Sequence, residues 1–221
     1  MSFDKLVAEH HAHGDLLNAI ELALPALGKT IGNITIEDLA PVDEFHIGGR
    51  QATDHLISQL RLSQHSHVLD LGCGLGGASR YVASHYRCHV AGIDLTLEYI
   101  KTGKALCAWL GLEELVTLEQ GSALSVPFDN NIFDAGFMLH VGMNIEDKSA
   151  LFSEVHRVMK PGACFGIYDI MREKNGELVY PLPWATEKQT SKLATPAQYQ
   201  QAIKDAGFTL IKVNNRRNFA L

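Results

Sequence analysis

The sequence has no run of about 18 uncharged apolar residues, so no membrane-spanning helix is expected. Its first residues, MSFDKLVAEHHAHGDLL, contain no apolar core of a signal peptide. Cysteine is scarce, because only Cys73, Cys88, Cys107 and Cys164 occur and no two form a C-x-x-C pair. This scatter disfavours a disulfide framework and a structural zinc site, and we expect a protein of the reducing cytoplasm.

Positive charge is also in short supply. The chain has 19 Lys and Arg against 25 Asp and Glu, a formal net charge of −6. Its basic cluster, Arg216-Arg217, is too short to neutralise many phosphates, so nucleic acids and anionic membranes are disfavoured as partners. Near the N-terminus His10, His11 and His13 lack an acidic or cysteine partner at ligand spacing, so we expect a solvated helix face and no metal site.

Strand and helix patterns alternate from Ser66 onward, which predicts an α/β fold. We expect a doubly wound, mainly parallel Rossmann-like sheet with a ligand crevice at the carboxyl ends of its strands. The predicted strands are 67–71, 88–94, 115–119, 133–139, 163–170 and 208–213, and the predicted helices between them are 77–86, 97–110, 147–159 and 196–206. Helical patterns at 4–30 and 51–62, separated by turn signals, precede the first strand. We therefore predict an N-terminal helical cover or lid over 1–62 and the ligand-binding domain over 63–221.

A glycine-rich turn follows the first predicted strand, in the segment 68–77, VLDLGCGLGG. Its glycines let the backbone approach a ligand closely, but the G-x-G-x-x-G spacing alone is weakly specific. Asp70 precedes the glycines, where a carboxylate would repel a pyrophosphate and attract a cationic ligand. Asp94 ends the second strand, where its carboxylate can accept hydrogen bonds from both hydroxyls of a ribose. The alternative is that both aspartates are turn or helix-capping residues.

Asp70, the glycines and Asp94 together resemble the class I S-adenosylmethionine (SAM)-dependent methyltransferases, of the methyltransferase type 11 domain. The resemblance continues through Gly121-Ser122-Ala123, the segment 126–134 and the segment 155–162. It implies that SAM is the methyl donor and S-adenosylhomocysteine the product. The residues that it assigns to the cofactor are Asp70, Gly72, Cys73 and Gly74 at the methionine end, Asp94 at the ribose, Leu95, Ser122 and Ala123 at the adenine, and His140 at the rim.

Three further segments, 43–50, 143–148 and 182–185, resemble the sarcosine/dimethylglycine methyltransferase-like branch. This likeness implies a small-molecule substrate, such as an amine derived from glycine. It suggests His46 and Arg50 as substrate contacts, with Arg50 facing a substrate carboxylate, together with Met143 and Trp184. A protonated amine needs a base, for which His140 at the predicted crevice is the first candidate and His46 the second. The alternative for each is a packing role.

Other interpretations remain open. The strip 137–142, FMLHVG, is more apolar than in the related branch, which favours a non-catalytic SAM-binding module. Within the methyltransferases a quinone-ring C-methyltransferase is the nearest rival, and an NAD-dependent dehydrogenase would share the glycine loop and the acidic residue. Few residues follow the predicted strand 208–213, so we expect an incomplete C-terminal sheet edge. The alternatives are that the chain is truncated there or that another subunit fills the gap, as in a homodimer.

Overall fold

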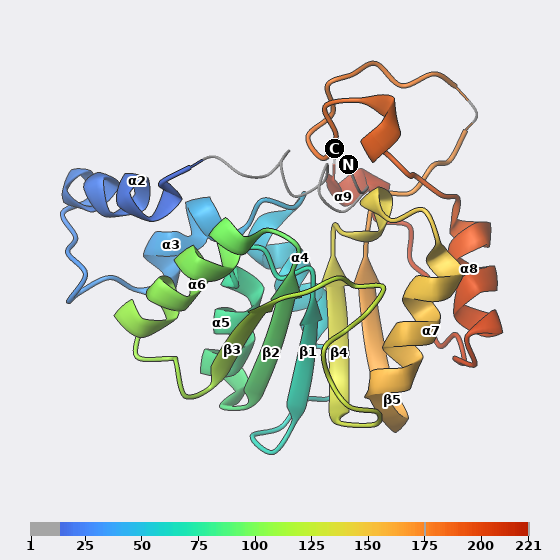
Figure 1. The fold of residues 1–221 in the computed structure, drawn as a ribbon, viewed down its shortest axis with the longest axis horizontal. Helices are drawn as coiled ribbons and strands as arrows, with labels where there is room; N and C mark the ends of the chain where they lie inside the picture. Colours follow the sequence, from blue (N-terminus) through green and yellow to red (C-terminus); the bar gives the residue numbers. More distant parts are fainter. Residues whose placement is uncertain (1–13, 175, 221) are drawn as a thin grey trace.

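The computed structural model describes residues 14–174 and 176–220, which form a five-stranded sheet flanked by helices (Figure 1). The strands have the order β3-β2-β1-β4-β5, and every pairing is parallel. They are β1 (His67–Leu71), β2 (His89–Asp94), β3 (Val116–Gln120), β4 (Phe133–Leu139) and β5 (Met159–Tyr168). The order reverses between β1 and β4, so the switch point of this Rossmann-like fold lies beside the glycine loop. The predicted fold class is confirmed.

Helices lie between successive strands of the sheet, except between β3 and β4. The helices are α2 (Leu16–Ala23), η1 (Leu24–Leu27), α3 (Ile36–Asp43), α4 (Gly49–Ile57), α5 (Gly77–Tyr86), α6 (Leu97–Trp109), η2 (Gly142–Asn144), α7 (Lys148–Val158), η3 (Lys188–Thr190), α8 (Pro196–Asp205) and α9 (Arg217–Ala220). Among the described residues, none of these helices has the length and apolarity to cross a membrane. The segment between β5 and α8 projects at the upper right of Figure 1.

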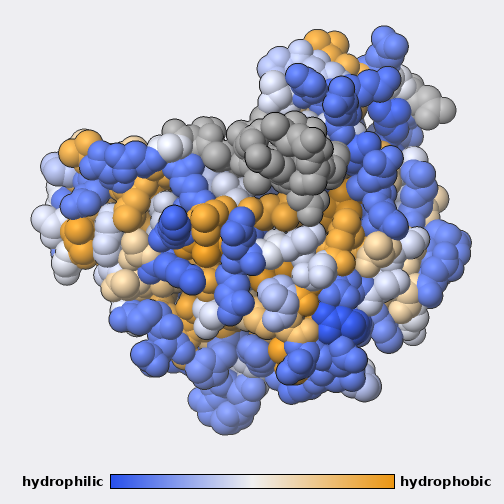
Figure 2. Space-filling model, viewed as in Figure 1, coloured by the Kyte–Doolittle hydropathy of each residue, from blue (hydrophilic) through white to orange (hydrophobic). Residues whose placement is uncertain are grey.

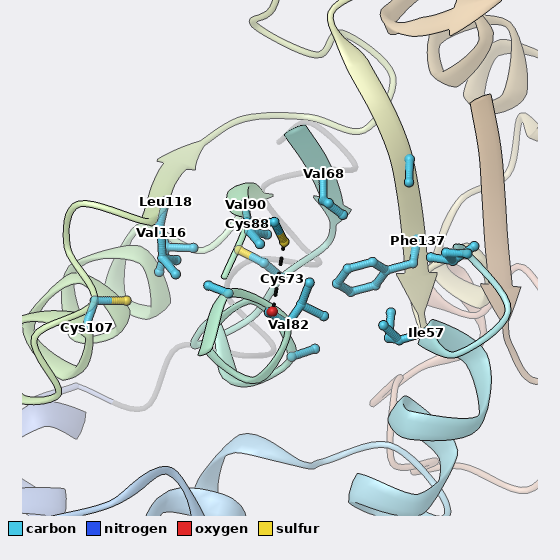
Figure 3. Close-up of a cluster of buried hydrophobic side chains, with 14 of the residues drawn as sticks. Ile57, Val68, Cys73, Val82, Cys88, Val90, Cys107, Val116, Leu118 and Phe137 are labelled. Atoms are coloured by element: carbon cyan, nitrogen blue, oxygen red, sulfur yellow. Dashed lines mark hydrogen bonds between the residues drawn. The ribbon is translucent and has the colours of Figure 1, made fainter. Parts of the chain in front are cut away.

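Successive side chains of each strand point to opposite faces of the sheet, and a hydrophobic core lies on each face. On β1, Val68 packs with residues of α4, α5 and α6, whereas Leu69 and Leu71 pack with residues of α7 and α8. Figure 3 shows the first of these cores, where the Cys88 thiol donates to the carbonyl of Val82 at 3.9 Å. On the face seen in Figure 2, hydrophobic residues gather in the middle and hydrophilic residues surround them.

The N-terminal helices pack directly on the sheet domain. Ile20 of α2 and Leu39 of α3 share a cluster with Leu75 of the glycine loop and Leu106 of α6. Helix α3 lies in a region that we expected to be turns, and a capping box between Thr35 and Asp38 begins it. The division into segments 1–62 and 63–221 stays a prediction, and the histidines at 10, 11 and 13 lie outside the described residues.

The prediction of a strand at 208–213 is wrong, because these residues form no regular secondary structure. Ile211 is 82% exposed and Val213 is 56% exposed, so the apolar pattern does not face a core. Lys212 instead reaches the end of α4, where its Nζ donates to Oε1 of Gln59 at 3.0 Å. A strand needs a partner for its backbone groups as well as suitable side chains. Within the described residues the sheet ends at β5, which agrees with the predicted incomplete edge.

Candidate active site

The glycine loop joins β1 to α5 and is fixed by the end of β2. The backbone N–H groups of Gly72 and Cys73 both donate to the carbonyl of Ile93, at 2.8 and 2.9 Å. Gly72 has φ +77°, and a Cβ there would lie 2.3 Å from a methyl of Val141. Gly74 has φ +54°, but its vacant side faces open space, with no atom within 4 Å. The loop therefore requires glycine at one position and presents bare backbone at the other.

Asp94 connects this loop to the end of β2. Its Oδ2 accepts from the N–H of Gly74 at 3.0 Å, and its Oδ1 accepts from the N–H of Thr96 at 2.8 Å. Burial raises the pKa of this carboxyl, and the two N–H groups oppose the rise. The Thr96 side chain also bonds to this carboxylate. A carboxylate has about four lone-pair sites, so acceptor capacity remains for a hydroxyl of a ligand.

Asp70 and Cys73 lie beneath the loop. Asp70 is 2% exposed, and its Oδ2 accepts from the hydroxyl of Ser79 at 2.6 Å. Burial raises the pKa of Asp70 to about 7, and burial also raises the pKa of the Cys73 thiol. The Cys73 side chain packs against the core beside Gly92. Both residues support the loop from below, so a ligand would meet the backbone of the loop before their side chains.

The residues predicted to meet an adenine lie at the same edge of the sheet. The N–H of Gly121 donates to the carbonyl of Asp94 at 3.0 Å, which joins the loop after β3 to the end of β2. Leu95 is half-buried, and Ser122 accepts from the N–H of Leu124 at 3.2 Å. Ala123 packs against the core on the α7 side. Leu95 is thus the chain neighbour of Asp94, and Ser122 and Ala123 follow the Gly121 that bonds to it. The role of these three residues as ligand contacts stays a prediction.

The two candidate bases, distant in sequence, meet at the carboxyl edge of the sheet. His140 follows β4 with φ +55°, and its ring stacks on Tyr168 of β5 with centroids 5.3 Å apart. His46, from the loop between α3 and α4, meets His140 edge-on with ring centroids 5.8 Å apart. Val141, the neighbour of His140, packs against Gly72. The histidine pair therefore adjoins the glycine loop.

Three residues of the α3–α4 region contact His46. Its Nε2 lies 3.0 Å from the carbonyl of Gly49, 3.0 Å from the hydroxyl of Thr53 and 3.4 Å from Oε2 of Glu44. Oε1 of Glu44 accepts from Nε of Arg50 at 2.5 Å. Glu44 and Thr53 were not predicted from the sequence. Two signals in the sequence could have identified them. Glu44 lies inside the segment 43–50 that carries the resemblance, and Thr53 follows Gly49 by one helical turn.

Electrostatics distinguishes the two histidines. Burial and the neighbouring His46 lower the pKa of His140 to about 4, so its imidazole is a weak base. Burial also lowers the pKa of His46, but Glu44 opposes this shift, as does the carbonyl of Gly49, while Arg50 adds to it. A negative charge next to an imidazole favours its protonated form. His46 is therefore better placed than His140 to hold a proton.

Arg50 is engaged by the protein on two sides. Besides its bond to Glu44, its guanidinium lies 4.3 Å from the centroid of the Tyr81 ring. Its Nη2 is buried and has no hydrogen-bond partner among the described residues. An unpaired buried donor is costly, and an anionic group of a ligand would satisfy it. The predicted contact of Arg50 with a substrate carboxylate stays a prediction.

Met143 and Trp184 belong to a second part of the carboxyl edge. Met143 in η2 is 3% exposed, and its carbonyl accepts from the N–H of Lys192 at 2.7 Å. The carbonyl of Trp184 accepts from Nδ2 of Asn144 at 2.8 Å, which fastens the segment around Trp184 to η2. Met143 therefore faces the core, whereas Trp184 is half-buried.

The apolar strip 137–142, which begins within β4, has a structural explanation. Phe137 and Met138 are both 0% exposed, on opposite faces of the sheet. Strands that are covered on both faces have continuous apolar sequences. The apolar side chains of Phe137 and Met138 therefore reflect core packing, and they do not argue against polar recognition at His140.

The chain was compared with known proteins. Residues 69–167 match the family model described as a methyltransferase domain. The chain is 30% identical to phosphoethanolamine N-methyltransferase 1 of Zea mays, over 85% of this chain and 37% of that protein. It is 26% identical to the glycine/sarcosine/dimethylglycine N-methyltransferase of Actinopolyspora halophila, over 78% of this chain and 30% of that protein. The chain spans about a third of the length of these curated relatives.

A solved structure shares the architecture. Geranyl diphosphate C-methyltransferase from Streptomyces coelicolor A3(2) superposes with a TM-score of 0.69 at 18% identity, covering 93% of this chain and 79% of that chain. That protein was crystallised with Mg²⁺, geranyl-S-thiolodiphosphate and S-adenosyl-L-homocysteine. At this identity the likeness shows the fold.

Proposed function

Because residues 69–167 belong to the methyltransferase domain family, we propose that this chain transfers the methyl group of SAM to the nitrogen of a small amine. The resemblance to class I SAM-dependent methyltransferases that the sequence carries is confirmed by the family match and the fold. The observation that carries the proposal is the meeting of His46 and His140 beside a glycine loop whose backbone at Gly74 faces open space.

The residues present fit the cofactor. SAM, when bound, supplies a methyl group that its sulfonium sulfur has already activated. Gly74 offers bare backbone to its methionine end, in the loop that Gly72 begins and beside the buried Asp70 and Cys73. Asp94 keeps acceptor capacity for a ribose hydroxyl, and Leu95, Ser122 and Ala123 follow β2 and β3 at the same edge of the sheet for the adenine. The protein aligns the acceptor and excludes water, which is the main requirement of methyl transfer.

We infer an amine acceptor because the site contains a candidate base, and an amine is an acceptor that needs one. An alkyl amine reaches the site as an ammonium at neutral pH and must lose a proton before its nitrogen is nucleophilic. His46 takes this role and His140 packs beside it, which reverses the order expected from the sequence, because His140 has the lower basicity. Arg50, with its unpaired Nη2, faces an anionic group of the same molecule. The names of two relatives, which specify phosphoethanolamine and glycine, sarcosine or dimethylglycine, support an acceptor that combines an amine with an anion.

A radiolabelled transfer assay tests the proposal. The chain is incubated with methyl-labelled SAM and, in turn, phosphoethanolamine, glycine, sarcosine, dimethylglycine and a quinol. Label on an amine that falls at least about tenfold in His46→Asn supports the proposal, as removal of a general base predicts. Label on the quinol ring would favour the C-methyltransferase alternative. Absence of S-adenosylhomocysteine binding in calorimetry, or binding of NAD in its place, would refute the assignment.

A cytoplasmic location and a homodimer remain predictions of this proposal. Light scattering of the purified chain measures the oligomeric state. Fractionation of the cells that express it measures the location.

A further inference from the structure

We propose that Glu44 and His46 form a carboxylate–imidazole pair in which Nδ1 of His46 accepts the substrate proton and Glu44 stabilises the imidazolium. The inference rests on the proposed function and goes further, because it assigns a positioning residue, a tautomer and the accepting atom. Glu44 is a positioning residue, since it touches His46 and acts through it.

The contacts of Nε2 determine the tautomer. The carbonyl of Gly49, 3.0 Å away, can only accept a hydrogen bond. The hydroxyl of Thr53 donates to Oε2 of Glu44 at 3.0 Å, so its oxygen accepts from His46. Nε2 is thus surrounded by acceptors and carries the hydrogen. Nδ1 then has the lone pair, and no described residue occupies it with a hydrogen bond.

The charges around His46 come from several elements. Glu44 is 6% exposed at its side chain and lies on the Nε2 side, with Asp43 next to it in the chain and Asp70 below. Arg50 of α4 neutralises part of this negative charge by its bond to Oε1. His140 after β4 and Tyr168 of β5 contribute rings, and Arg216 of the C-terminal segment acts on Tyr168 from outside. Within the part of the chain that the structure describes, His46 is the one of the two histidines with a carboxylate within 4 Å.

The proton transfer is balanced. The N–H bond of the substrate ammonium breaks, its electron pair stays on the nitrogen, and a bond forms between the proton and Nδ1. The imidazolium keeps its Nε2 hydrogen directed at Gly49, Thr53 and the Glu44 carboxylate. Release of the Nδ1 proton to water restores the starting tautomer. A third group that orients a base and stabilises its cation is the arrangement of other carboxylate–histidine catalysts.

NMR of the full chain with ¹⁵N-labelled histidine tests the pair directly. The His46→Gln variant identifies the His46 signals, and long-range ¹H–¹⁵N correlations distinguish the two tautomers. We expect the Nε2–H form in the parent. Glu44→Gln removes the negative charge and should lower the His46 titration midpoint by about 1–3 pH units. Arg50→Gln removes the opposing positive charge and should raise it. The exposed Glu114→Gln is the control and should leave it unchanged.

Kinetics with the acceptor found in the transfer assay provides the second readout. In Glu44→Gln the acidic limb of the kcat/KM profile should move to lower pH, because a less basic imidazole stays neutral at lower pH. The plateau should fall at the same time, since a weaker base transfers the proton less readily. A structural role alone would lower the plateau without moving the limb.

The outcomes separate the two proposals. An Nδ1–H tautomer in the parent, an unchanged midpoint in Glu44→Gln, or shifts of the same sign in Glu44→Gln and Arg50→Gln would overturn the pair. Calorimetry with S-adenosylhomocysteine accompanies every variant and reports that the fold and the cofactor site are intact. Failure of the parent to bind S-adenosylhomocysteine would refute the proposed function, whereas normal binding with an unshifted His46 would refute only the pair.

Discussion

Replacement of Asp43 by alanine should be among the most destabilising single changes in this chain. Asp43 accepts from Nη2 of Arg80 at 2.5 Å, and both side chains are 0% exposed. The other partners of this guanidinium are neutral: the carbonyl of Leu75 at 2.6 Å, that of Gly103 at 3.4 Å and the sulfur of Cys107 at 3.8 Å. Without Asp43 the buried positive charge of Arg80 would have no counterion among the described residues.

The expected loss of stability in Asp43→Ala follows from leaving the Arg80 charge buried without its partner. Removal of one partner from a buried ion pair costs about 3–5 kcal/mol in the free energy of unfolding. In a protein of this size each kcal/mol lowers Tm by about 2–4 °C. The midpoint of thermal unfolding should therefore fall by about 6–20 °C in Asp43→Ala.

Urea unfolding followed by circular dichroism measures the free energy. The double variant Asp43→Ala with Arg80→Met removes both charges and should be more stable than Asp43→Ala alone. Glu173→Ala removes one partner of the exposed pair with Arg217, at 3.6 Å, and should change stability by less than about 0.5 kcal/mol. A loss below about 1 kcal/mol in Asp43→Ala, or a double variant less stable than the single one, would refute the reasoning.

Three further predictions concern the glycine loop and its carboxylates. Asp94→Ala should weaken S-adenosylhomocysteine binding at least about tenfold in calorimetry, because hydrogen bonds to a charged group contribute about 1.5–3 kcal/mol each, and unchanged affinity would disprove the ribose assignment. Gly72→Ala should cost about 1–3 kcal/mol more in urea unfolding than Gly162→Ala, because both residues have positive φ near 80° but only the first Cβ would clash, with Val141. The pKa of Asp70 is about 7 in the folded protein, above its value when unfolded, so the folded state alone holds this proton between about pH 4 and 7. The stability of the parent relative to Asp70→Asn should therefore fall as pH rises through that window, and a flat difference in urea unfolding would contradict the prediction.

Local pattern was enough to predict most of the sheet. The bounds of β1, β4 and α5 agree with the sequence prediction, because a short apolar run or an amphipathic stretch ends at glycine or a turn in each case. Helix α3 was missed because it is short and contains Pro41, although its capping box was present in the sequence. The segment 208–213 was misread because apolar residues that favour strands also occur in an extended, exposed segment without a pairing partner.

The site divides in the same way. The glycine loop and Asp94 could be located from the sequence, because each directly follows or ends a strand that its own apolar residues predict. The environment of His46 is only partly local, because Glu44 is two residues away in the chain but His140 meets it only when β4 has taken its place beside β5. For the same reason the sequence ranked His140 above His46, since burial and the neighbouring charge decide their basicity after folding.

One peptide unit separates the two anchors of the α3–α4 region. Asp43 grips Arg80 of the helix that begins at the glycine loop, and Glu44, the next residue, holds His46. Neighbouring Cα atoms are about 3.8 Å apart and cannot stretch. The proposed cofactor loop and the proposed proton acceptor are therefore joined through two adjacent residues of one short segment, one contacting α5 and the other contacting the imidazole.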